Sequence, residues 1–324
     1  MKNYLVTGVA GFIGAYVAKV LLKEGHRVVG IDSINNYYDI SLKNYRIKNL
    51  IQNSTFIFYK INIEDKKELK TVFNNYKFAA VYNLAAYAGV RYSIKNPNIY
   101  INTNTIGTLN ILELMKDYYV QKIILASTSS LYAGQKQIPY HENLDVNMPA
   151  SPYAASKKAA ESIAYTYHYL YNLDVSIVRY FTVYGPAGRP DMSIFRFIQW
   201  INNHHPVKIF GDGSYCRDFT YIDDIVKGTI LARKMLGYEV INIGSGNSPI
   251  TIQDIIKRIS KLLKKKANIQ YFPASKADMN STWADIAKIN KLFQWKPKTS
   301  LEEGLEKTIS WHIVNQEWLK KIIM

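Results

Sequence analysis

The chain has 324 residues, and 41 Lys and Arg against 25 Asp and Glu give it a formal charge of +16. Hydrophobic residues make up 48% of it, with only 17 Gly and 10 Pro, so a disordered or fibrous protein is excluded. The length suits about two domains. One cysteine, Cys216, excludes an intrachain disulfide and a cysteine-built metal site, and we expect no metal.

The basic surplus is spread over both halves of the chain. Its densest run, residues 264–266, follows an amphipathic stretch at 252–263, which is typical of a solvated helix end. The chain has neither zinc-finger spacing nor an aromatic RNA-binding motif, and no apolar run approaches about 20 residues. We therefore expect a cytoplasmic protein that binds neither nucleic acid nor membrane.

Short β-rich runs alternate with amphipathic stretches through the first half. The pattern predicts a helix at 13–23 and strands at 4–7, 27–32, 55–61, 80–84, 122–127 and 174–180. Several of these runs are almost continuously apolar, as in strands that are buried on both faces of a parallel sheet. The rhythm predicts an α/β fold with a Rossmann-type, doubly wound parallel sheet.

After Tyr180 the rhythm loosens into segments punctuated by Gly and Pro, at 184–190 and 210–214, which indicate loops. We expect residues 1–180 to form a cofactor-binding domain that some later segments rejoin. Residues 181–324 then form mainly a smaller, substrate-side lobe. No linker rich in Pro, Gly or Ser separates the two, so we expect them to share an interface.

A glycine-rich run, residues 7–14, follows the first strand directly and opens the first helix. Gly8, Gly11 and Gly14 allow a tight turn and a close approach of backbone N–H groups to a diphosphate. Asp32 ends the second strand, where a carboxylate accepts hydrogen bonds from a ribose diol. The same carboxylate would repel a 2′-phosphate, which favours NAD over NADP.

A candidate catalytic pair lies near the start of another predicted helix, with Ser151 as its N-cap. Tyr153 and Lys157 then lie one turn apart on one face, where the ammonium would lower the pKa of the phenol. Upstream, a strand ends in the hydroxyl cluster 127–130, and ligands bind at the carboxyl ends of parallel strands. A chance pair and ordinary turn chemistry are the alternatives.

These features resemble the extended short-chain dehydrogenase/reductases over nearly the whole chain. Further strings resemble the nucleotide-sugar epimerase and dehydratase branch of that family, at 83–86, 179–182, 217–224 and 283–285. Three strings are most similar to UDP-glucuronate 4-epimerases, at 34–39, 88–93 and 181–192.

The resemblance implies an NAD-dependent 4-epimerase of a UDP-sugar, foremost UDP-glucuronate to UDP-galacturonate, working through hydride removal from C4, a 4-keto intermediate and hydride return. It implies that Thr128, Tyr153 and Lys157 are catalytic. Besides Tyr153 and Lys157, the implied NAD-binding residues are Gly8, Gly11, Phe12, Ile13, Gly14, Asp32, Asn62, Ile63, Leu84, Ala85, Ala86 and Asn104. The implied substrate-binding residues are Arg91, Ser129, Ser130, Thr182, Arg189, Lys208, Phe210, Arg217 and Asp278.

Ser129 and Ser130 stand where related dehydratases carry an acidic pair and related decarboxylases a Glu, which favours simple epimerisation. By the resemblance, Arg189 would hold the substrate carboxylate with charge-assisted hydrogen bonds. Cys216 and Asn62 depart from the usual pattern and leave the exact nucleotide sugar open.

Three alternatives to this function remain: a 4-epimerase of a neutral or N-acetylated UDP-hexose, a UDP-glucuronate decarboxylase, and an NAD-binding regulatory protein without catalysis. Amphipathic stretches at 99–115 and 154–170 would pair across a homodimer as in relatives, although contacts within one chain explain the same periodicity.

Overall fold

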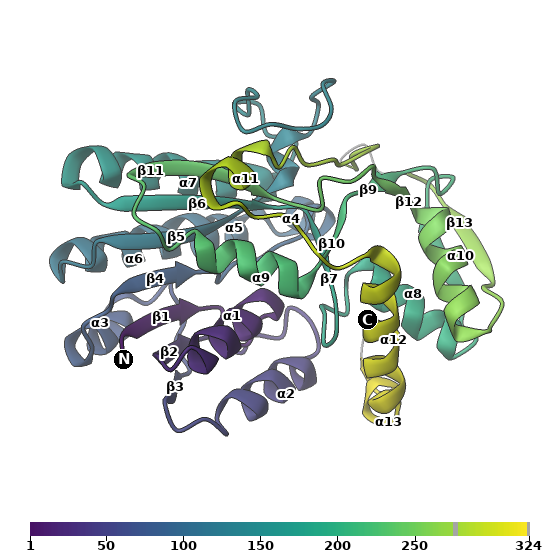
Figure 1. Ribbon diagram of the computed structural model, residues 1–324, viewed down its shortest axis with the longest axis horizontal. Helices are drawn as coiled ribbons and strands as arrows, with labels where there is room; N and C mark the ends of the chain where they lie inside the picture. Colours follow the sequence, from purple (N-terminus) through teal and green to yellow (C-terminus); the bar gives the residue numbers. More distant parts are fainter. Residues whose placement is uncertain (275–277, 323–324) are drawn as a thin grey trace.

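A central parallel sheet organises the protein. The computed structural model describes residues 1–274 and 278–322. Seven strands lie in the order β11-β6-β5-β4-β1-β2-β3 (Figure 1). They are β1 (Asn3–Thr7), β2 (Arg27–Ile31), β3 (Phe56–Tyr59), β4 (Ala80–Asn83), β5 (Lys122–Thr128), β6 (Asp174–Tyr180) and β11 (Tyr238–Ile243). All their pairings are parallel, which confirms the Rossmann-type α/β prediction.

Helices cover both faces of this sheet (Figure 1). Helices α1 (Phe12–Lys23) and α9 (Ile222–Leu231) contact each other on one face, and α2 (Ile40–Leu50) lies beside α1. The other face packs against α3 (Lys66–Asn75), α6 (Gly107–Asp117) and α7 (Pro152–Tyr171). Strand side chains alternate between the two cores, since Val28 joins the first and Val29 the second.

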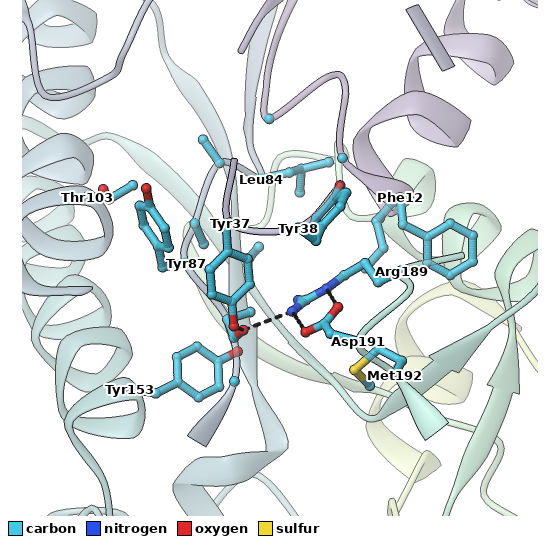
Figure 2. A pocket seen from close by; sticks show the side chains of 18 of the residues that line it. Phe12, Tyr37, Tyr38, Leu84, Tyr87, Thr103, Tyr153, Arg189, Asp191 and Met192 are labelled. Atoms are coloured by element: carbon cyan, nitrogen blue, oxygen red, sulfur yellow. Dashed lines mark hydrogen bonds and ion pairs between the residues drawn. The ribbon is translucent and has the colours of Figure 1, made fainter. Parts of the chain in front are cut away.

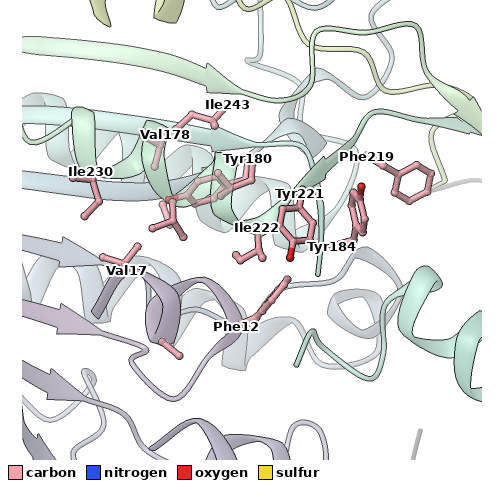
Figure 3. Close-up of a cluster of buried hydrophobic side chains, with 14 of the residues drawn as sticks. Phe12, Val17, Val178, Tyr180, Tyr184, Phe219, Tyr221, Ile222, Ile230 and Ile243 are labelled. Atoms are coloured by element: carbon pink, nitrogen blue, oxygen red, sulfur yellow. The ribbon is translucent and has the colours of Figure 1, made fainter. Parts of the chain in front are cut away.

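The core beside α1 continues out of the sheet domain into the second half of the chain. Figure 3 shows Phe12 of α1 facing Ile222 of α9, with Tyr180, Tyr184 and Tyr221 around them, and all five are buried. A shared apolar core of this kind holds the two halves in one arrangement. The interface predicted from the missing linker is therefore present.

The second half of the chain is built from short elements. Two small parallel pairs join β7 (Thr182–Tyr184) to β10 (Phe219–Tyr221) and β8 (Val207–Phe210) to β13 (Ile269–Phe272). An antiparallel pair joins β9 (Cys216–Arg217) to β12 (Ile250–Thr251). The helices here are α8 (Ser193–Asn202), α10 (Ile252–Leu263), α11 (Ala287–Phe293), α12 (Leu301–Val314) and α13 (Gln316–Leu319).

The remaining elements are short connections near the carboxyl edge of the sheet. They are α4 (Val90–Lys95), α5 (Pro97–Tyr100), the π-helix η1 (Ile101–Ile106) and the 3₁₀ turn η2 (Ser129–Tyr132). Within the described ranges, no helix is long and apolar enough to cross a membrane. The same residues contain no group of three or more His, Cys, Asp or Glu side chains that could hold a metal ion.

Candidate active site

A cavity of about 1300 Å³ runs along the carboxyl ends of the strands. Such an edge is where ligands bind in open α/β sheets. Most of the predicted site residues line it, from both halves of the chain: Gly8, Gly11, Phe12, Ile13, Gly14, Asp32, Asn62, Ile63, Leu84, Ala85, Ala86, Arg91, Thr128, Ser129, Ser130, Tyr153, Lys157, Thr182, Arg189 and Asp278. Four predicted residues do not line it: Asn104, Lys208, Phe210 and Arg217.

The glycine-rich loop at one end of this cavity leaves no room for side chains. Gly8 has a φ of +66°, and a Cβ atom there would lie 2.7 Å from the backbone of Ala85. The Gly11 amide donates to the Gly8 carbonyl at 2.9 Å, and helix α1 begins at the next residue. The helix N-terminus thus faces a cradle of bare backbone, which suits a diphosphate.

Two further side chains complete this end. The Thr7 hydroxyl donates to Asn83 at 2.7 Å and accepts from the amides of Leu84 and Ala85, which sets the β4 end against the glycine loop. The buried Asp32 carboxylate accepts from the amides of Ala10 and Ile34. It lies at the end of β2, where a ribose diol would follow a diphosphate. The residues present therefore fit a dinucleotide cofactor.

Lys43 is a buried cation in the same region that the sequence prediction missed. Its ammonium donates to the backbone carbonyl and the side-chain oxygen of Asn35, at 2.8 and 2.7 Å. Burial lowers the pKa of Lys43, and the nearby Asp32 carboxylate opposes that shift. A signal was available, since Leu42, Arg46 and Leu50 follow a helical repeat whose buried face also includes Lys43.

The predicted catalytic group comes together at the middle of the cavity. Ser151 caps α7 by accepting from the Ala154 amide at 3.2 Å, as predicted. Tyr153 and Lys157 are buried on the cavity side of α7. Thr128, at the end of β5, accepts the Ser130 amide on its hydroxyl oxygen, so its proton is available for the hydrogen bond with Tyr153. Figure 2 shows the hydroxyl ends of Tyr153 and Tyr37 turned toward the same space.

The electrostatics of this group include a cation that the sequence prediction did not consider. Burial raises the pKa of the Tyr153 phenol, while the Thr128 hydrogen bond and the Arg189 charge oppose the rise. The Lys157 ammonium, one helical turn away, donates to the Ala126 carbonyl at 2.9 Å. Burial lowers the pKa of Lys157 to about 8, opposed by the Glu161 carboxylate. Arg189 is thus one cation that favours the phenolate, and the effect predicted for Lys157 stays a prediction.

Asn104 has a different setting from the one expected. The side chain is fully buried in η1, where its oxygen accepts from the Tyr87 amide and its nitrogen donates to the Tyr87 carbonyl and the Ser156 hydroxyl. These bonds tie the segment after β4 to α7. Asn104 therefore supports the cavity wall and is not one of the residues that line the cavity.

Arg189 enters the cavity from the second half of the chain as one member of an ion pair. Its Nε and Nη2 face the Asp191 carboxylate at 3.0 and 2.6 Å, and Nη2 also donates to the Ala88 carbonyl at 2.9 Å (Figure 2). Asp191 thus occupies the edge of the guanidinium that usually grips a carboxylate. The predicted role of Arg189 as a carboxylate partner stays a prediction, because Asp191, two residues away, takes only the Nε and Nη2 edge of the guanidinium.

A second ion pair closes the far end of the cavity. Arg91 of α4 meets Asp278 with Nη2 and Oδ2 2.5 Å apart, and its guanidinium carbon lies 3.8 Å from the centroid of the Phe210 ring. Phe210 is therefore covered by Arg91. Lys208 points outward from β8, and Arg217 donates to the carbonyl of Cys216.

Other residues of the cavity wall were not predicted either. Tyr37, Asp191 and Arg196 line it, and the Nε of Arg196 is buried without a hydrogen-bond partner among the described residues. Tyr37 and Asp191 lie in the segments 34–39 and 181–192, which are similar to UDP-glucuronate 4-epimerases. That similarity was the sequence signal for both as cavity residues. For Arg196 the only signal was a single charged residue in a largely apolar helix.

Known proteins match this chain over almost its full length. The family described as GDP-mannose 4,6 dehydratase matches residues 5–308. A UDP-glucuronate 4-epimerase from Thermodesulfobacterium geofontis is 57% identical over 322 residues, which covers 99% of each chain.

Two solved structures show the same arrangement. The UDP-glucuronic acid 4-epimerase of Bacillus cereus, in complex with UDP-glucuronic acid and NAD, matches with a TM-score of 0.90 and 38% identity, covering 97% of this chain and 99% of the other. The UDP-glucose 4-epimerase of Thermotoga maritima with UDP-glucose matches with a TM-score of 0.89 and 32% identity, at the same coverage.

Proposed function

We propose a function from one premise: the chain belongs to the nucleotide-sugar epimerase and dehydratase family of the extended short-chain dehydrogenase/reductases. It is an NAD-dependent 4-epimerase that converts UDP-glucuronate to UDP-galacturonate. One observation carries this function: Tyr153, the assigned proton acceptor, and Arg189, the assigned carboxylate partner, line the same cavity as the glycine loop.

Each catalytic side chain has a defined task in this reaction. NAD, when bound, takes the hydride from C4 of the sugar and returns it to the opposite face. Tyr153 removes the proton of the 4-hydroxyl through its phenolic oxygen and later gives it back. The Thr128 hydroxyl donates a hydrogen bond to the Tyr153 oxygen or to the 4-oxygen of the sugar, the two atoms between which the substrate proton moves. Lys157 orients the nicotinamide ribose with its ammonium, which has three N–H donors and uses one on the Ala126 carbonyl.

The cofactor end supplies the remaining contacts. Gly8, Gly11 and Gly14 hold the diphosphate of NAD with backbone groups, and Asp32 accepts from the adenosine ribose. Asn62, Ile63 and the segment 84–86 line the same part of the cavity and are assigned to the dinucleotide, with Phe12 and Ile13.

The carboxylate of the sugar decides between epimerisation and decarboxylation. A 4-keto uronate is a β-keto acid, so its carboxylate must be held in an orientation from which carbon dioxide leaves slowly. We assign that task to Arg189, Ser129, Ser130 and Thr182, which line the cavity around Tyr153. Because Asp191 neutralises part of the Arg189 charge, the carboxylate meets the Nη1 side of the guanidinium or displaces Asp191.

The UDP moiety is assigned to the far end of the cavity. Arg91 and Asp278 are the contacts that line it, and Arg196 adds an unpaired guanidinium nitrogen. Phe210, Lys208 and Arg217 lie beyond the cavity wall. For the uracil to stack on Phe210, the Arg91 side chain has to leave the face of that ring.

The proposal also includes an oligomeric state and a cellular compartment. A homodimer is supported by exposed apolar side chains on the neighbouring elements η1 and α7, namely Ile101, Ile106, Tyr165, Tyr169 and Leu170. Sedimentation equilibrium of the purified chain tests it. A reducing cytoplasm as the compartment is supported by the single cysteine.

The function is tested by incubating the purified protein with UDP-glucuronate and identifying the products by NMR. UDP-galacturonate supports the proposal, whereas a UDP-pentose with carbon dioxide indicates a decarboxylase. Turnover of neutral UDP-hexoses alone overturns the assigned substrate. In the same assay, Arg189→Ala is expected to weaken the use of UDP-glucuronate by about 100-fold, since a charge-assisted contact of about 3 kcal/mol is lost. Equal losses on UDP-glucose would contradict the role of Arg189.

A further inference from the structure

Arg46 is a buried arginine that the proposed reaction does not use. It lies on α2 with 3% of its surface exposed and does not line the cavity. Its Nη1 donates to the carbonyl of Ala10 at 2.8 Å and to the Tyr38 hydroxyl at 2.8 Å. Its Nε and Nη2 donate to the Ala187 carbonyl at 3.1 and 2.8 Å, and Nη2 also donates to the Gly188 carbonyl at 2.9 Å.

These partners belong to two loops with different tasks. Ala10 lies in the glycine-rich loop between Gly8 and Gly11, at the cofactor end. Ala187 and Gly188 directly precede Arg189, which faces the sugar. One planar guanidinium therefore bridges the cofactor loop and the loop that carries the carboxylate contact.

The second loop needs such support because its own backbone is strained. Ala187 has a φ of +52°, in the left-handed region that residues with a Cβ atom rarely adopt. The carbonyl before it, that of Pro186, accepts from the Tyr16 hydroxyl of α1 at 3.0 Å. Three successive carbonyls, at 186, 187 and 188, are thus held by side chains of the first half of the chain.

We propose that Arg46 is a positioning residue that sets the Arg189 loop relative to the cofactor loop, so that the sugar carboxylate is held while C4 faces the cofactor. The inference rests on the proposed function. Arginine suits the task because its five N–H donors lie in one rigid plane, whereas a lysine ammonium is a point donor on a flexible stem. A lysine at this position keeps the charge but cannot span both loops.

Movement of the Arg189 loop is expected to change the products of the reaction. If the Arg189 loop drifts, the carboxylate of the 4-keto sugar can rotate. The C5–C6 bond then breaks, carbon dioxide leaves, and the electron pair passes to the C4 ketone as an enolate that takes up a proton at C5. If the sugar leaves at this stage, it leaves as a UDP-4-keto-pentose and the hydride from C4 stays behind as NADH, in an amount equal to the carbon dioxide. If the hydride returns to C4 first, the product is a UDP-pentose and NAD is restored. Carbon dioxide therefore forms each time the positioning fails.

The test compares Arg46→Lys and Arg46→Met with Lys48→Met, an exposed residue of the same helix. Each protein, with its bound NAD, is given UDP-glucuronate, and UDP-galacturonate, carbon dioxide and NADH are measured, together with the Kd values of UDP-glucuronate and UDP. Both Arg46 variants are expected to lose about 10- to 100-fold in kcat/KM for epimerisation, to release more carbon dioxide per turnover, and to keep the affinity for UDP. Lys48→Met is expected to behave as the wild type.

The outcomes separate positioning from stability. An unchanged ratio of carbon dioxide to UDP-galacturonate in folded Arg46 variants would overturn the inference, as would full rescue by Arg46→Lys. If neither variant folds, Tyr16→Phe carries the test, because it frees the Pro186 carbonyl alone and is expected to move the same ratio by a smaller amount. An unchanged ratio of carbon dioxide to UDP-galacturonate in Tyr16→Phe would also overturn the inference. Failure of the wild type to form UDP-galacturonate is a failure of the proposed function instead.

Discussion

The two ends of the cavity are built in different ways. At the cofactor end, backbone groups of one short loop do the work, and Gly8, Gly11 and Gly14 lie within seven residues. At the nucleotide end, long side chains from distant elements meet, with Arg91 on α4, Phe210 on β8 and Asp278 after β13.

The difference lies in what each end does without a ligand. The glycine loop is fixed by its own turn and by Thr7, so its amides keep their places. The side chains at the nucleotide end satisfy one another, since Arg91 pairs with Asp278 and covers Phe210. The cofactor end is thus preorganised, whereas the proposed function requires the nucleotide end to exchange internal contacts for ligand contacts.

The largest effect is expected where the two ends meet. Tyr153→Phe removes the only atom assigned to accept the 4-hydroxyl proton, so epimerisation should slow by about 10²- to 10⁴-fold. Neither end of the cavity changes, so the NAD content and the Kd of UDP-glucuronate should stay as in the wild type. NMR rates, the NAD released on denaturation and calorimetric titration measure the three quantities. A variant that retains most of its activity would mean that another group takes the proton.

Gly8→Ala is expected to disrupt the preorganised cofactor end. The φ of +66° costs about 1–2 kcal/mol for a residue with a Cβ atom, and the contact with the Ala85 backbone adds to it. NAD content and the free energy of unfolding should both fall, while UDP affinity persists.

Gly25→Ala is the matched control for this variant. Its φ is +80°, but a Cβ atom there meets nothing within 4 Å. It should show the backbone cost alone and keep its NAD. Equal loss of NAD in both variants would mean that the close contact with Ala85 is unimportant.

The smallest effect on stability is expected at the nucleotide end. Arg91→Ala removes a partly exposed ion pair, worth about 0.2–1 kcal/mol in unfolding free energy. The Kd of UDP should nevertheless rise about tenfold, since a charge-assisted contact is lost, with NAD content unaffected. Arg91→Lys, which keeps the charge, should recover part of the affinity. Tighter UDP binding by Arg91→Ala would instead mean that Arg91 only obstructs Phe210.

Local sequence was sufficient to predict the glycine turn and the helical placement of Tyr153 and Lys157. A glycine turn, an N-cap at Ser151 and the helical spacing of Tyr153 and Lys157 are properties of a few consecutive residues. Strand β6 was predicted at its observed bounds for the same reason, since seven consecutive residues are buried.

The remaining features depend on contacts between distant segments. Asn104 was assigned to the cofactor, but its side chain bonds Tyr87 and Ser156 behind the cavity wall, which no local pattern reveals. The pairing of Arg189 with Asp191 depends on a loop conformation. Arg46 was missed because its partners lie in two other loops.

The position of β11 beside β6 affects the folding of this chain during synthesis and the choice of truncated fragments. Strand β6 is buried along its whole length, yet its outer neighbour is formed only by residues 238–243. During synthesis, β6 therefore leaves the ribosome with an open apolar edge that waits until the segment 181–237 has followed. A fragment that ends at residue 180 keeps that edge exposed, which invites pairing with other chains. A shortened cofactor-binding fragment for biotechnology should therefore retain β11.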